Sequence, residues 1–71
     1  MFVKLRIRMP DGEERVEVLN LSPRTKVREA LEALGLNPME FLVVKGKKVV
    51  YDEVELEDGE EFLVIPAVSG G

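Results

Sequence analysis

Residues 2–9 read Phe-Val-Lys-Leu-Arg-Ile-Arg-Met, and from Val3 onward apolar and charged side chains alternate. The apolar side chains that share one face are Val3, Leu5, Ile7 and Met9. Because successive side chains of a β-strand point to opposite faces, this pattern predicts a strand with one buried face. The chain is therefore expected to build a sheet that is covered on one side.

A hairpin is expected next. Pro10-Asp11-Gly12 provides turn residues, since proline fixes φ and glycine permits a positive one. Residues 13–19 alternate again, which predicts a second strand with Val16 and Val18 pointing inward.

A helix follows Ser22-Pro23, because the apolar spacing changes there. The residues at helical spacing are Val27, Ala30, Leu31 and Leu34. Ser22 or Thr25 is expected to cap the start, and Gly35 followed by Leu36 is typical of a helix end with a left-handed residue. We expect one amphipathic helix of about three turns.

The remaining segments predict three more strands, at residues 41–45, 48–51 and 62–65, the last of them ended by Pro66. Between the last two lies an acidic connection, interrupted by Leu56 as an expected core residue and by Asp58-Gly59 as an expected turn. The order β-β-α-β-β-β predicts an α+β fold with one helix packed on a mixed sheet. In it the first and last strands are free to pair in parallel at the centre. Residues 1–66 are expected to form the domain and residues 67–71 a tail.

Length and composition exclude several classes of function. A chain of 71 residues has room for one small domain, and the absence of cysteine and histidine removes thiol and imidazole nucleophiles and the usual zinc ligands. A net charge of −4 with four aromatic residues argues against nucleic-acid binding. No apolar run is long enough to cross a membrane, so a cytoplasmic protein is expected, and the composition is compatible with a thermophilic source.

The first feature that could take part in chemistry is the pair Gly70-Gly71. Without Cβ atoms, two glycines can thread a narrow channel and present a carboxylate to another protein's active site. A carboxylate is a poor electrophile, so it needs conversion to an acyl-adenylate before a sulfur or amine nucleophile attacks. The chain has no phosphate-binding loop of its own, so ATP would be used by a partner. The alternative is a frayed chain end without function.

The second feature is that two strands are apolar on both faces, Phe41-Leu42-Val43-Val44 and Phe62-Leu63-Val64-Ile65. We expect Leu42, Val44, Phe62 and Val64 to point at the helix. The outward side chains would then be Phe41, Val43, Leu63 and Ile65, which would form a patch for a protein partner near the tail. The alternatives are ordinary central strands, or a register shifted by one residue.

The acidic residues at 52–61 do not follow the spacing of a calcium-binding loop, so a solvated loop is expected. Its charge is suited to steering a basic partner towards the last strand. Tyr51 has no base beside it in the sequence and is interpreted as a packing residue.

Taken together, several segments of the chain resemble the ubiquitin-like sulfur carriers, the molybdopterin synthase small subunit and the thiazole-biosynthesis sulfur carrier. The segments are Leu34-Gly35-Leu36-Asn37-Pro38, residues 43–49, residues 56–61 and, most specifically, Leu63-Val64-Ile65-Pro66-Ala67-Val68-Ser69-Gly70-Gly71. The resemblance implies a β-grasp fold. The proline after the last strand is similar to the molybdopterin branch, whereas Lys45-Gly46 departs from the Asn-Gly frequent in that turn.

The resemblance also implies a mechanism in which the chain is not an enzyme and binds no cofactor. The carboxyl of Gly71 would be adenylated by a ubiquitin-activating-like adenylyltransferase that consumes ATP, then converted to a thiocarboxylate. The sulfur would pass to an acceptor synthase subunit or a tRNA-thiolation enzyme. Gly70 and Ser69 would belong to the tail, and Ile65, Pro66 and Val68 to the partner interface.

Three hypotheses therefore stay open. The first is a sulfur carrier for molybdenum cofactor synthesis or tRNA thiolation. The second is a protein modifier joined to lysines through Gly71, and the third is an interaction domain with an incidental tail.

Overall fold

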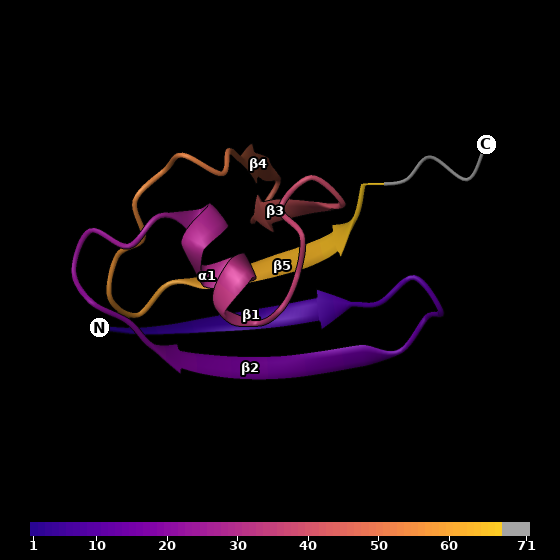
Figure 1. The fold of residues 1–71 in the computed structure, drawn as a ribbon, viewed down its shortest axis with the longest axis horizontal. Helices are drawn as coiled ribbons and strands as arrows, with labels where there is room; N and C mark the ends of the chain where they lie inside the picture. The colour runs from indigo at the N-terminus through magenta and orange to yellow at the C-terminus, as the bar shows by residue number, and fades with distance from the viewer. Residues whose placement is uncertain (68–71) are drawn as a thin grey trace.

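The alternating segments fold into a five-stranded sheet with one helix on one face (Figure 1). The structure is a computed structural model and describes residues 1–67. Its elements, in order, are β1 (Phe2–Arg8), β2 (Glu14–Asn20), α1 (Val27–Ala33), β3 (Phe41–Lys45), β4 (Lys48–Val50) and β5 (Glu61–Pro66). The predicted α+β order is confirmed.

The strands lie in the order β2-β1-β5-β3-β4. β1 and β5 run parallel, with Lys4 opposite Glu61 and Ile7 opposite Val64, and the other neighbours are antiparallel. The first and last strands thus pair at the centre, as expected. This is the β-grasp arrangement, in which β5 lies between β1 and β3.

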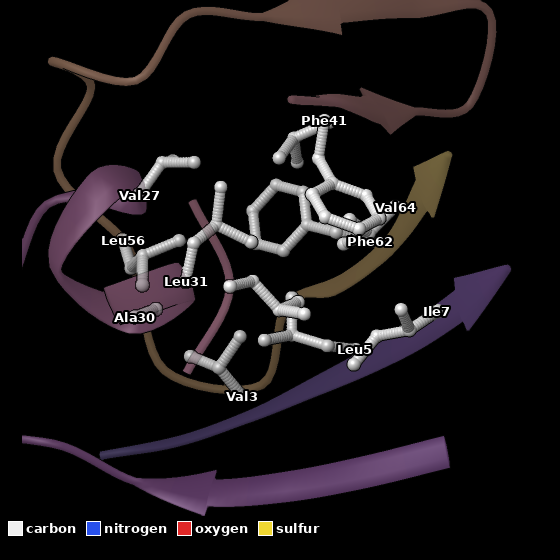
Figure 2. Close-up of a cluster of buried hydrophobic side chains, with 12 residues drawn as sticks. Val3, Leu5, Ile7, Val27, Ala30, Leu31, Phe41, Leu56, Phe62 and Val64 are labelled. Carbon is white, nitrogen blue, oxygen red and sulfur yellow. The ribbon is translucent and has the colours of Figure 1, made fainter. Parts of the chain in front are cut away.

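The core lies between α1 and the sheet (Figure 2). Its buried members are Val3, Leu5, Ile7, Val27, Ala30, Leu31, Leu36, Phe41, Val43, Leu56, Phe62 and Val64. Leu56 comes from the connection between β4 and β5 and is 4% exposed, so the prediction that it interrupts the acidic run as a core residue is confirmed. No polar or charged side chain is buried within residues 1–67.

The orientation predicted for β2 is wrong, because Val16 and Val18 point away from the core and are 51% and 63% exposed. The hairpin pairs Arg8 with Glu14, which sets Val16 opposite Arg6. Because the helix-facing positions of β1 are Val3, Leu5 and Ile7, the residues opposite Arg6 and Lys4 lie on the uncovered face.

The helix is shorter than predicted, seven residues or about two turns. Neither Ser22 nor Thr25 caps it: the Thr25 hydroxyl donates to the Ser22 carbonyl (2.6 Å), and the cap position belongs to Lys26, whose N–H donates to Glu29 Oε1 (2.9 Å). The next two amides reach the loop before β5, since Val27 N–H donates to the Val54 carbonyl at 2.9 Å. Arg28 N–H donates in the same way to the carbonyl of Asp52, at 3.0 Å.

The predicted helix end is confirmed. Gly35 has φ +76°, and the Leu36 N–H donates back to the Leu31 carbonyl at 2.9 Å. This is the hydrogen-bond pattern of a Schellman motif, which requires the left-handed conformation that glycine adopts easily.

In the part of the chain that the structure describes, no helix combines the length and apolar character needed to cross a bilayer.

Candidate functional site

The uncovered face of the sheet carries an apolar patch beside the end of β5. We call it the open-face patch, and it consists of Leu42, Val44, Val49, Leu63 and Ile65. Leu63 and Ile65 are half-buried and point away from α1, as the sequence predicted. Leu42 and Val49 are 41% and 50% exposed, which makes this the most apolar part of the face next to the tail. Large exposed apolar clusters on a small domain mark sites where other proteins bind.

The prediction that Phe41 and Val43 share this face is wrong. They are 8% and 3% exposed and lie in the core under α1, while their neighbours Leu42 and Val44 point outward. The antiparallel pairing with β5 fixes this, because Val43 lies opposite the buried Val64. The register of β3 is thus shifted by one residue from the expected one, and the members of the open-face patch that the sequence interpretation missed are Leu42, Val44 and Val49. The signal that identifies them is the pairing of β3 with β5, which the apolar run alone does not contain.

The base of the tail is held by a backbone hydrogen bond. Pro66 closes β5, and the N–H of Ala67 donates to the carbonyl of Glu40 at 2.8 Å. Val68, Ser69, Gly70 and Gly71 lie outside the described residues. The structure therefore fixes the position of Ala67, next to both the open-face patch and the loop before β3.

Charged groups border the open-face patch on the β1 side. Lys4, Arg6 and Arg8 alternate along β1 on the same face, and ion pairs join Lys4 to Glu61 (3.9 Å) and Arg6 to Glu14 (3.7 Å). A shallow hollow of about 170 Å³ lies between Arg6, Val44 and Leu63. The face thus offers apolar contact at one side and exposed basic groups at the other. This combination suits a protein partner better than a small ligand.

The acidic segment before β5 is solvated, as expected, and forms local ion pairs. Glu53 accepts a hydrogen bond from Lys26 (3.1 Å) and lies 3.2 Å from Arg28, and these two cations lower the pKa of its carboxyl, Lys26 contributing most. Lys45 pairs with Glu60 at 2.6 Å, and that hydrogen bond raises the pKa of the lysine ammonium. Within residues 1–67 no three acidic side chains come together as a metal site. Tyr51 is 74% exposed, so its interpretation as a packing residue is wrong.

Comparison with known proteins adds a sequence relative and several structural neighbours. No family model matches the chain. The sulfur carrier protein TtuB of Thermus thermophilus is 38% identical over 65 residues, which cover 92% of this chain and 94% of that protein.

Two solved structures share the fold. One is a ubiquitin of Caldiarchaeum subterraneum, with a TM-score of 0.62 and 19% identity over 100% of both chains. The other is the ubiquitin-like domain of Plasmodium falciparum Dsk2, with a TM-score of 0.62 and 12% identity over 94% of this chain and 100% of that one. At these identities the neighbours establish the fold alone, whereas the sequence relative covers nearly the whole of both chains. The chain belongs to the ubiquitin-like sulfur carriers, and its role is that of a carrier rather than of an enzyme.

Proposed function

We propose that the carboxyl group of Gly71 is the sulfur-carrying position. In the first step a carboxylate oxygen attacks the α-phosphorus of ATP on a ubiquitin-activating-like adenylyltransferase, and pyrophosphate leaves. In the second, a hydrosulfide attacks the carbonyl carbon of the acyl-adenylate, and AMP leaves with the C–O bonding electrons. The product is a C-terminal thiocarboxylate, in which one sulfur has replaced one oxygen. The proposal requires Gly71 to be the C-terminal residue of the mature protein.

The observation that carries this proposal is the similarity to a sulfur carrier over 94% of that protein's length, together with the Gly70-Gly71 pair. The geometry is compatible with it. The tail leaves from a central strand and from the Ala67–Glu40 hydrogen bond, so the domain offers a rigid body from which a carboxyl is delivered into another enzyme. Glycines suit a narrow channel that leads to the active site of the other enzyme, because a side chain would collide with the walls of that channel.

The acceptor of the sulfur is the second half of the proposal. A thiocarboxylate donates sulfur either to a pterin precursor in molybdenum cofactor synthesis or to an activated base in tRNA thiolation, and the two are distinguished by incubation with each acceptor system. Transfer to the tRNA-thiolation system alone, or to the pterin system alone, assigns the pathway. Conjugation to lysines of other proteins, the alternative raised by the sequence, is a further outcome of the same assay.

The test is intact-mass analysis of the purified chain after incubation with the adenylyltransferase of the same organism, ATP and sulfide. The expected result is the mass increase of one sulfur for one oxygen, located on the C-terminal peptide. The control is a chain that lacks Gly71, which should show no increase. A wild-type chain that keeps its mass, or one that appears only as higher-mass lysine conjugates, contradicts the proposal.

A further inference from the structure

A second apolar surface lies along β3 and β4 and meets the open-face patch at Leu42 and Val49. It is a groove of about 260 Å³, and its lining includes Leu31, Met39, Phe41, Val50, Tyr51 and Ala67. Leu31 and Phe41 belong to the core and form its floor. Met39 and Tyr51 stand at its rim and are 84% and 74% exposed, the two most exposed large apolar side chains among residues 1–67.

The groove adjoins the point where the tail begins, because Ala67 is part of its lining. Residues 68–71 span at most about 14 Å when fully extended. An enzyme that holds the carboxyl of Gly71 in its active centre must therefore approach within that distance of Ala67. Its surface then lies against the part of the domain around Ala67, and the groove belongs to that part.

From this placement we propose that the groove is a docking site for the enzyme that activates Gly71, and that it receives an apolar side chain flanked by a basic group. The inference rests on the proposed function, since it requires an enzyme that acts on Gly71. The groove shares Leu42 and Val49 with the open-face patch and extends from them to the core residues Leu31 and Phe41.

The chemistry of the groove supports this occupant. Of the described residues that line it, Asp52 is the one that carries a charge. The Asp52 carbonyl accepts the Arg28 N–H at 3.0 Å, so the backbone that carries this carboxylate is anchored to the helix. A cation at the rim would pair with it while an apolar neighbour enters the groove. Methionine and tyrosine suit the contact, because methionine adapts to the shape of its partner and tyrosine is enriched among residues that dominate binding energy.

The experiment measures kcat and KM for the carrier in its ATP-dependent activation by the adenylyltransferase of the same organism. The rate is read from pyrophosphate exchange. The variants are Met39→Asn and Asp52→Lys. The matched control is Val18→Asn, which changes an apolar side chain that is 63% exposed on β2, away from Ala67. Each variant is first checked for an unchanged thermal unfolding midpoint, which is expected because all three side chains are exposed.

The expected result is a KM raised about tenfold for Met39→Asn and Asp52→Lys, with kcat changed less than about twofold, because docking precedes the chemical step. The control should match the wild type. If the wild type is activated and the two groove variants keep its KM, the docking inference is wrong and the proposed function stands. If the wild type is not activated at all, both fail.

Two other occupants are separated by measurements on the chain alone. If the wild type sediments as a dimer and Met39→Asn as a monomer, a second copy fills the groove. If nuclear Overhauser contacts join residues 68–71 to Tyr51 in the isolated protein, its own tail fills it. Either result overturns the inference, whereas a monomer without such contacts and with the raised KM supports it.

Discussion

Ile7 and Val64 lie opposite each other in the parallel pairing of β1 and β5, and both side chains are 0% exposed. They join the first strand to the last within the core. The two strands come from opposite ends of the described chain, so this contact joins segments that are far apart in the sequence. A loss of volume here is therefore expected to weaken the whole domain.

Ile7→Val should lower the free energy of unfolding by about 1 kcal/mol and Ile7→Ala by about 3 to 4 kcal/mol, from lost burial and the cavity left behind. A domain of this size has a total of about 4 to 10 kcal/mol, so the alanine variant is expected to be close to unfolding. Urea denaturation measures both. Val18→Ala, at a side chain 63% exposed, serves as the control and should change the free energy by less than about 0.5 kcal/mol.

The orientation of β3 is tested by a pair of lysine substitutions. Val43→Lys should unfold the domain, because the side chain is 3% exposed and a buried charge there has no partner. Ile65→Lys should leave the domain folded, because Ile65 is half-buried on the uncovered face of the sheet. It should weaken binding of an enzyme that contacts the open-face patch. Circular dichroism reports folding and calorimetry reports binding. Unfolding of the Ile65 variant, with a folded Val43 variant, would reverse the orientation described above.

Removal of Gly71 is expected to abolish sulfur loading without changing the thermal unfolding midpoint by more than about 1 °C. The reason is that the core residues identified within residues 1–67 all lie between Val3 and Val64. Differential scanning calorimetry and the mass assay are run on the same sample. A large drop in the midpoint would mean that the tail contributes to the folded domain.

Gly35→Ala should lower the free energy of unfolding by about 1 kcal/mol. An added Cβ meets nothing within 4 Å, so the whole cost comes from the positive φ of +76°. Gly35→Asn should cost less, because asparagine tolerates the left-handed conformation better than alanine. Equal stability of the alanine variant and the wild type would mean that the helix end has rearranged.

Acidification is expected to weaken the attachment of α1 to the loop before β5. The pKa of Glu53 is lowered from its ordinary value of 4.5, first by the hydrogen bond from Lys26 and then by the charge of Arg28. A carboxyl with a lowered pKa in the folded state stabilises the fold above its unfolded pKa, and this contribution disappears as the pH falls through the folded pKa. The wild type should therefore have a higher thermal unfolding midpoint than Glu53→Gln at neutral pH. This difference in midpoint should become smaller below about pH 4.5 and in high salt. A difference that is constant down to pH 2 contradicts this.

The fold was predictable because its signals are local and agree with one another. The alternation over residues 2–9, the turn at Pro10-Asp11-Gly12 and the helix end at Gly35 each specify one element, and together they predict the order of the elements. The helix start was not predictable in the same way. Ser22 and Thr25 are good cap residues, but they bond to each other in a turn, and the helix begins only where Lys26 meets Glu29.

Which face of β2 and of β3 meets the core was not predictable from the composition of these strands. In β2, valines alternate with Arg15 and Glu17, so the sequence separates two faces without saying which one meets the helix. In β3 both faces are apolar, and only the pairing of Val43 with Val64 determines which face meets the helix. For the candidate site, the outward orientation of Leu63 and Ile65 was predicted correctly, because Phe62 and Val64 were expected to face the helix. The groove at Met39 and Tyr51 was not, because it arises from the packing of a loop against two strands and the helix.

The parallel pairing of β1 with β5 also bears on how the protein is made. On the ribosome β1 can pair with β2 as soon as residue 20 has emerged, but its other edge has no partner until residues 61–64 have emerged. Until then Leu5 and Ile7 lack their partners Phe62 and Val64, and the nascent chain displays an incomplete apolar surface. A truncated translation product should therefore be degraded rather than compete with the complete carrier for its enzymes.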